Sequence, residues 1–180
     1  ESVCRPVITG EGGGEMREPA GFAEFVRHES PRLLRAAHLL THDWHAAEDL
    51  VQTALINALP RWVRIDHPDA YVRRSMLNAF LSGRERRWTG EVPTKSLPEG
   101  AAAAGPDADV RLTLLRALAE LPRQQRAVIT LRFFDDQTEA QTAALMGLSL
   151  GTVKSHSSRA LAALRAHPAL KDVLVTEVMS

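Results

Sequence analysis

The sequence TEAQTAALMGLSLGTVKSHSSRALAALR (residues 138–165) predicts two short helices that are joined by a tight turn. Thr138 can cap the first helix, and Gln141, three residues later, can complete a capping box. Gly147 stands where a left-handed residue would end that helix, and Ser149 can cap the second helix. The pattern is typical of a helix-turn-helix, in which the second helix enters the major groove of DNA.

The second of these helices has an apolar side and a polar side. The apolar seam consists of Leu145, Leu148, Val153, Leu161 and Leu164. The polar side consists of Thr152, Lys154, Ser155, His156, Ser158 and Arg159. Residues 149–165 contain no Asp or Glu, which suits a surface that meets phosphates. On spacing alone, a structural helix pair with a solvated outer face stays open as the alternative to DNA binding.

Length and charge limit the class of protein. The chain has 180 residues, of which 44% are hydrophobic, and this length allows one domain or two small ones. The net charge is zero, but the charges are unevenly distributed. Residues 1–70 lean acidic, whereas residues 71–88 combine one acid, Glu85, with Arg73, Arg74, Arg84, Arg86 and Arg87. This basic segment could contact phosphates.

The chain has one cysteine, Cys4, which excludes an internal disulfide and a cysteine-based zinc site. A single thiol suits a reducing compartment, so we expect a cytoplasmic protein. No apolar run approaches the roughly 20 residues that cross a bilayer, and residues 1–19 lack the pattern of a signal peptide. We expect residues 1–19 to be a disordered extension, with Met16 as a candidate start, and no contact with a membrane.

Apolar residues recur at helical spacing along most of the chain. Helices are expected over residues 22–40, 44–62 and 67–88, with Asp43 as the cap of the second and Asp66 or Asp69 as the cap of the third. Pro31 indicates a kink or a break in the first. No segment alternates as a strand would, so the fold class is all-α.

The helical pattern stops over residues 89–108, which contain three prolines and three glycines. This composition predicts a flexible, extended linker. Helical spacing resumes near Val110, and Pro122 opens the helix before the helix-turn-helix. We therefore expect two separate helical domains, residues 20–88 and 109–167, and a C-terminal tail over residues 168–180.

Four segments occur in an order and spacing that resemble a known family. They are AEDLVQTALINAL (47–59), DAYVRRSMLNAFLSGRERR (69–87), LPRQQRAVITLRFFDD (121–136) and GLSLGTVKSHSSRALAALR (147–165). The chain resembles bacterial RNA polymerase sigma factors of the extracytoplasmic function group in the sigma-70 family, in particular the SigE-like actinobacterial subgroup. The resemblance implies a sigma-2 domain (20–88) and a sigma-4 domain (109–167) that bind core polymerase, read the promoter −10 and −35 elements and promote DNA melting. The resemblance also implies that the chain is not an enzyme and binds no cofactor.

The resemblance also implies roles for particular residues. The −35 element would be read by Thr152, Lys154, Ser155, His156, Ser158 and Arg159, with Arg123 and Arg126 on nearby phosphates. His156 and Ser158 depart from the common pattern of the family. The −10 element would be held by Arg73, Arg74, Asn78, Arg84, Arg86, Arg87 and Trp88. Tyr71 and Trp62 are expected to serve the core, because aromatic residues at helical spacing usually pack inward.

Polymerase contacts would come from the second expected helix. Glu48, Asp49, Leu50, Gln52 and Thr53 would face the β′ clamp helices, and the β flap would be a further contact on the core. Some of the apolar residues must serve the protein core instead. The alternative role of Glu48 and Asp49 is to complement the helix dipole. An anti-sigma factor is a further candidate partner.

Two other functions compete with the sigma factor. A stand-alone helix-turn-helix regulator would bind DNA as a dimer without polymerase, and an interaction protein would bind only proteins. No phosphate loop, nucleophile elbow or cysteine–histidine pairing favours an enzyme. His38, His42 and His45 are candidate metal ligands, but residues 41–43 break the helical register, so no metal site is expected. Asp135, Asp136 and Glu139 are expected to flank a helix.

Overall fold

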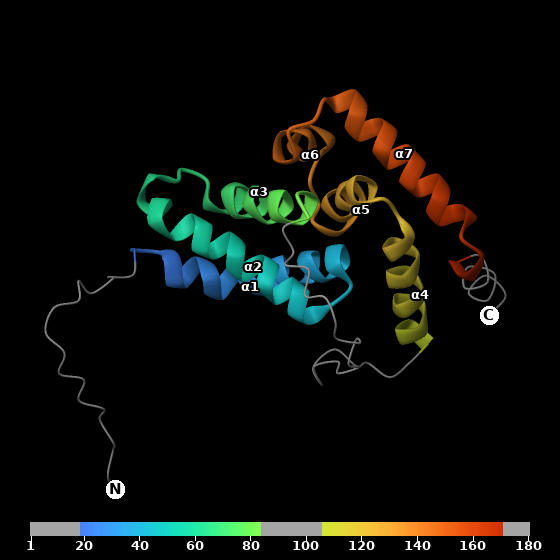
Figure 1. Ribbon diagram of the computed structural model, residues 1–180, viewed down its shortest axis with the longest axis horizontal. Helices are drawn as coiled ribbons and strands as arrows, with labels where there is room; N and C mark the ends of the chain where they lie inside the picture. Colours follow the sequence, from blue (N-terminus) through green and yellow to red (C-terminus); the bar gives the residue numbers. More distant parts are fainter. Residues whose placement is uncertain (1–18, 84–105, 171–180) are drawn as a thin grey trace, which may run out of the picture.

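The structure, a computed structural model, describes residues 19–83 (the first half) and 106–170 (the second half). In these ranges the regular elements are all helical, as predicted, and no strand occurs (Figure 1). The first half contains α1 (Phe22–Thr41), α2 (Trp44–Ala58), the 3-10 segment η1 (Leu59–Arg64) and α3 (Pro68–Leu81). The second half contains α4 (Pro106–Glu120), α5 (Arg123–Ile129), the π segment η2 (Thr130–Phe134), α6 (Glu139–Met146) and α7 (Leu150–Ala166).

Several predicted residues lie outside the described ranges. They are Arg84, Arg86, Arg87 and Trp88 of the expected −10 segment, Cys4 with the rest of residues 1–18, residues 89–105 of the expected linker, and residues 171–180 of the tail. Helix α4 begins at Pro106, three residues before the expected domain boundary at 109. Proline suits this position because its fixed φ matches the first turn of a helix.

Local sequence signals account for most helix ends in the first half. The Asp43 carboxylate accepts a hydrogen bond from the Ala46 backbone N–H at 2.7 Å, so the predicted cap of α2 is confirmed. Helix α1 continues through Pro31 without a break. The expected side-chain cap of α3 is wrong: His67 occupies the N-cap without a side-chain hydrogen bond, and Pro68 begins the helix.

The first half is a helical bundle in which α2 packs against both α1 and α3. Trp62 is buried and meets the rings of Phe22 and Phe25 edge-on, with centroids 4.9 and 5.0 Å away. The predicted core role of Trp62 is therefore confirmed, and Tyr71, which is half-buried, packs against the same core. In the second half, α7 packs against α5 and α6.

The two helical halves pack against each other, a contact that the sequence did not predict. Helix α3 packs against α5 and α6, and α1 packs against α4, α5 and η2 (Figure 1). Ala127, Leu131 and Leu145 of the second half are buried in the hydrophobic core of the first half. The halves pack because each has apolar residues that the other covers. We call this contact the domain interface.

None of the helices within residues 19–83 and 106–170 has the length and apolar character needed to cross a membrane.

Candidate nucleic-acid interface

Helices α6 and α7 form the predicted helix-turn-helix. The Thr138 hydroxyl accepts a hydrogen bond from the Gln141 backbone N–H at 3.1 Å, and the Gln141 side-chain oxygen accepts from the Thr138 N–H at 2.8 Å. Gly147 ends α6 with a φ of 65°, and the Ser149 hydroxyl accepts from the Thr152 N–H at 3.1 Å. The capping box, the left-handed glycine and the second cap are confirmed.

The outer face of α7 carries the groups that a DNA groove requires. Lys154, Ser155, Ser158 and Arg159 are exposed, while Val153 on the opposite face is fully buried. Arginine can pair with guanine through two hydrogen bonds, and serine and lysine are less selective donors. The exposed Lys154 ammonium lies 3.8 Å from the carboxylate of the half-buried Glu139, and a phosphate could take the place of this carboxylate.

Thr152 and His156 contribute less to this face, because both are half-buried. The Thr152 hydroxyl is 2.8 Å from the Ser149 hydroxyl, so it takes part in the cap of α7. One ring nitrogen of His156, Nδ1, is buried without a hydrogen-bond partner. Of the six predicted −35 contacts, four side chains are therefore fully accessible to a partner: Lys154, Ser155, Ser158 and Arg159.

Arg123 and Arg126 lie at the domain interface, away from the outer face of α7. Arg123 donates to the backbone carbonyl of Phe80 at 3.1 Å, and Arg126 donates to that of Leu40 at 2.7 Å. Both guanidinium groups also lie over the Phe80 ring, 5.5 and 5.9 Å from its centroid. In this arrangement Arg123 and Arg126, which the resemblance assigns to DNA phosphates, both contact the first half.

On α3 the expected −10 residues separate into two groups. Arg74 and Asn78 are exposed and line a groove between α2 and α3. Arg73 is only 2% exposed. As an open phosphate contact, Arg73 is therefore wrong for this arrangement, because its guanidinium points into the domain interface.

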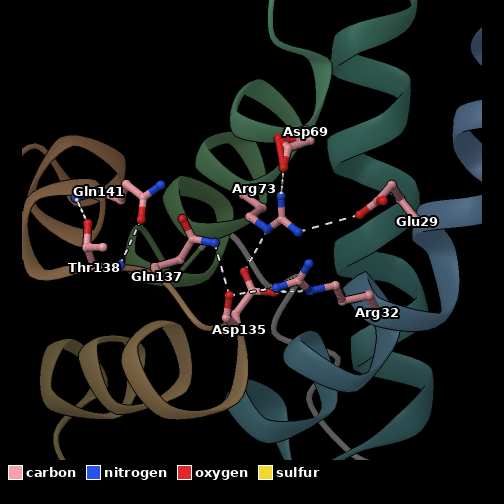
Figure 2. A network of polar contacts seen from close by, with 8 residues as sticks. All are labelled: Glu29, Arg32, Asp69, Arg73, Asp135, Gln137, Thr138 and Gln141. Carbon is pink, nitrogen blue, oxygen red and sulfur yellow. Dashed lines mark hydrogen bonds and ion pairs between the residues drawn. The ribbon is translucent and has the colours of Figure 1, made fainter.

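Arg73 is the centre of a network of charged side chains (Figure 2). Its Nε lies 2.6 Å from the Asp135 carboxylate, and its other nitrogens contact the carboxylates of Asp69 and, at 3.5 Å, Glu29. Arg32 Nε reaches the second Asp135 oxygen at 2.7 Å. Burial would lower the pKa of the Arg73 guanidinium, but the carboxylates of Asp135 and Asp69 raise this pKa above its ordinary value. Arg73 therefore stays charged.

Sequence reasoning missed the main role of Asp135. It was expected to flank α6, yet its side chain is 3% exposed and pairs with cations of α1 and α3. The Arg73–Asp135 contact joins residues 62 positions apart. No local pattern could indicate such a pair.

The expected polymerase-binding residues lie on α2. Glu48, Asp49, Gln52 and Thr53 are exposed, and the last three line the same groove as Arg74 and Asn78. Leu50 is 4% exposed and packs in the hydrophobic core, so a polymerase contact through its side chain is wrong for this structure. The exposed face is acidic and amide-rich and could meet a basic partner surface.

The three candidate metal-ligand histidines, His38, His42 and His45, lie in different surroundings. The His38 ring stacks on Trp44, with centroids 4.1 Å apart, and His45 is exposed. Both ring nitrogens of His42 are buried without a hydrogen-bond partner. Within the described ranges, no three His, Cys, Asp or Glu residues are grouped as metal ligands.

Comparisons with known proteins agree with this architecture. The family pattern described as "Sigma-70 region 2" matches residues 25–89, and "Sigma-70, region 4" matches residues 111–164. The chain is 40% identical to the RNA polymerase sigma-E factor of Streptomyces coelicolor over 88% of its own length and 92% of that protein. It is 31% identical to the ECF RNA polymerase sigma factor RpoE of Cereibacter sphaeroides, over 85% and 89% of the two chains.

Two solved structures are also similar. The sigma factor RpoE of Bartonella quintana, in a co-crystal structure with the anti-sigma factor NepR, matches with a TM-score of 0.61 and 27% identity. That match covers 85% of this chain and 96% of the other. CnrH, in complex with the cytosolic domain of CnrY, matches with a TM-score of 0.58 and 25% identity over 81% and 85% of the chains.

The two helical regions, the helix-turn-helix and the matches to both sigma-70 regions thus identify a transcription initiation factor. The chain belongs to the sigma-70 family of RNA polymerase sigma factors, among those of the extracytoplasmic function group.

Proposed function

We propose that this chain reads the −35 element with the exposed face of α7 and the −10 element with the segment that begins in α3. As a sigma factor it directs RNA polymerase to promoters. Residues 20–88 would act as the sigma-2 domain and residues 109–167 as the sigma-4 domain. The contacts to bases would come mainly from the exposed side chains Lys154, Ser155, Ser158 and Arg159.

One observation supports this proposal most strongly: the chain combines two different surfaces that sigma factors need. The outer face of α7 is basic and polar without acids, which suits a DNA groove. The outer face of α2 carries Glu48 and Asp49, which suits a basic protein surface. A stand-alone regulator would not need the second surface.

We further propose how the −10 strand is held. Arg74 and Asn78 line one groove with Tyr71, and this combination offers a cation for a phosphate and an amide and an aromatic ring for an unstacked base. Base stacking on aromatic rings contributes about 1–3 kcal/mol per base. Arg84, Arg86, Arg87 and Trp88, which follow α3 in the sequence, would extend this contact along the strand.

The proposed partners are the β′ clamp helices for α2, the β flap of core polymerase, promoter DNA and an anti-sigma factor. The solved relatives support the last of these, since both are complexes with such a factor or with a cytosolic domain. The proposal includes no catalytic site in this chain, because the polymerase performs the chemistry. It also places the chain in the cytoplasm, where its relatives' polymerase acts.

The test combines the purified chain with sigma-free core polymerase and genomic promoter fragments. Initiation at defined start sites that needs both chain and core supports the proposal. Tight duplex binding in the absence of core, with no effect on initiation, would establish the stand-alone regulator instead. Binding to neither DNA nor core polymerase would favour the remaining hypothesis, an interaction protein that binds only other proteins.

A further inference from the structure

An acidic side chain of α6 lies beside the outer face of α7. The Glu139 carboxylate is 3.8 Å from the Lys154 ammonium, and this pair joins the two helices of the helix-turn-helix, which lie next to each other (Figure 1). Residues 149–165 contain no Asp or Glu. Glu139 therefore brings a negative charge to a face whose own residues are basic and polar, and the proposed function does not use it.

The structure fixes the position of the Glu139 carboxylate more firmly than that of the Lys154 ammonium. Glu139 begins α6 directly after the N-cap Thr138, whose capping box with Gln141 has hydrogen bonds of 3.1 and 2.8 Å (Figure 2). The Glu139 side chain is 35% exposed, whereas that of Lys154 is 60% exposed. The carboxylate thus restrains the lysine, because a long exposed side chain loses rotamer freedom when it is paired.

Lysine is a poor reader of sequence when it is not restrained. Its ammonium is a compact charge on a flexible stem, and such a charge binds phosphates on every DNA sequence. An ammonium also has three donors, so it can stay beside a carboxylate and donate to a base acceptor at the same time. A carboxylate that holds Lys154 in place therefore favours a nearby base over a more distant phosphate.

The place of Lys154 in the fold suits a base contact. Lys154 lies in the second turn of α7, and the N-terminal part of a recognition helix is the part that contacts base edges. The first helix of the motif, here α6, crosses the DNA backbone. The Glu139 carboxylate on α6 would repel a phosphate that could otherwise draw Lys154 out of the groove.

We propose that Glu139 is a specificity-determining residue of the −35 interface, which acts by positioning Lys154. On promoter DNA the ion pair stays intact while the ammonium also donates to a base acceptor. On other DNA Lys154 must leave Glu139 to reach a phosphate, so it adds less affinity there. This inference rests on the proposed reading of the −35 element by α7.

The test measures holoenzyme binding to a mapped promoter fragment and to the same fragment with a scrambled −35 element. Glu139→Gln should raise affinity for the scrambled fragment by about two- to fivefold, the range of exposed ion pairs, without raising affinity for the promoter. The salt slope on the scrambled fragment should steepen by about one, because the released Lys154 neutralises a further phosphate. Asp136→Asn removes the same charge from an exposed residue just before α6 and should change neither quantity.

A Lys154→Ala background separates positioning from other effects of Glu139. In that background Glu139→Gln should leave the ratio of promoter to scrambled affinity unchanged. An equal fall of this ratio in both backgrounds would overturn the inference, because Glu139 would then act on DNA directly or through the stability of α6. An unchanged ratio and an unchanged salt slope for Glu139→Gln in the chain that keeps Lys154 would also overturn it.

Arg159→Ala distinguishes failure of this inference from failure of the proposed function. If Arg159→Ala lowers the affinity ratio and Glu139→Gln does not, the inference alone fails. If the wild-type holoenzyme does not prefer the promoter −35 element, the proposed function fails. In that case the salt slope of Glu139→Gln on any duplex still shows whether Glu139 restrains Lys154.

Discussion

His42 should make the stability of this protein fall at mildly acidic pH. The residue ends α1 in a left-handed conformation with a φ of 61°, and both its ring nitrogens are buried without hydrogen bonds. Burial, the nearby Arg126 cation and His38 lower its pKa from 6.5 to about 4. The neutral ring is therefore favoured in the folded chain.

The sign of the effect follows from proton linkage. Between pH 6.5 and pH 4 the unfolded chain binds a proton at His42 that the folded chain does not bind. The free energy of unfolding therefore falls as the pH falls through this window. The linkage relation gives about 2 kcal/mol at pH 5, and solvent screening of a half-buried ring reduces this to roughly 1 kcal/mol.

The measurement is urea unfolding at pH 7.5 and pH 5.0, followed by circular dichroism of the helices. The variant His42→Asn removes the titrating ring and suits the left-handed backbone, since asparagine tolerates that conformation. From pH 7.5 to pH 5.0, the free energy of unfolding should fall by roughly 1 kcal/mol more in wild type than in His42→Asn. His45→Asn, at an exposed position on α2, is the control and should follow wild type. An equal loss in wild type and His42→Asn would refute the reasoning.

Three further predictions concern the DNA and polymerase contacts. Arg159→Ala should reduce discrimination at one −35 base pair by about 1–3 kcal/mol in competition binding of the holoenzyme, and an equal loss on all sequences would contradict base readout. Arg74→Ala should weaken holoenzyme binding on every sequence and reduce the salt slope by about one, whereas an unchanged slope would argue against a phosphate contact. Asp49→Lys should raise the Kd for core polymerase at least about tenfold with an unchanged helix signal, because like charges across an interface repel; unchanged affinity would place the polymerase contact elsewhere.

Gly147 supplies the final prediction, about the turn itself. Its φ is 65°, and no atom lies within 4 Å of an added Cβ, so the cost of a side chain comes from the backbone conformation. Gly147→Ala should destabilise the chain by about 1–2 kcal/mol in urea unfolding. Gly151→Ala, within α7, is the control and should be neutral or stabilising, because alanine favours a helix interior. Equal effects of the two substitutions would contradict the role of the left-handed turn.

Local interactions explain why most of the fold could be predicted from sequence. The caps at Asp43, Thr138 and Ser149 and the turn at Gly147 depend on residues within four positions of each other. The exposed face of α7 also follows from helical periodicity. The predicted cap of α3 was wrong because neither Asp66 nor Asp69 occupies the N-cap position; His67 does, and Pro68 begins the helix without a side-chain cap.

The amino-acid order therefore accounts for the helices, the helix-turn-helix and the family, all of which depend on short-range spacing and on motifs read in sequence. Packing between distant segments accounts for the rest. This packing buries Arg73, directs Arg126 to the backbone carbonyl of Leu40 and brings Asp135 to Arg32 and Arg73. The physical reason is that the sequence around a charged residue looks the same whether its side chain contacts water, a phosphate or a carboxylate. The packing of α1 and α3 against the second half determines which partner each of these charged side chains contacts.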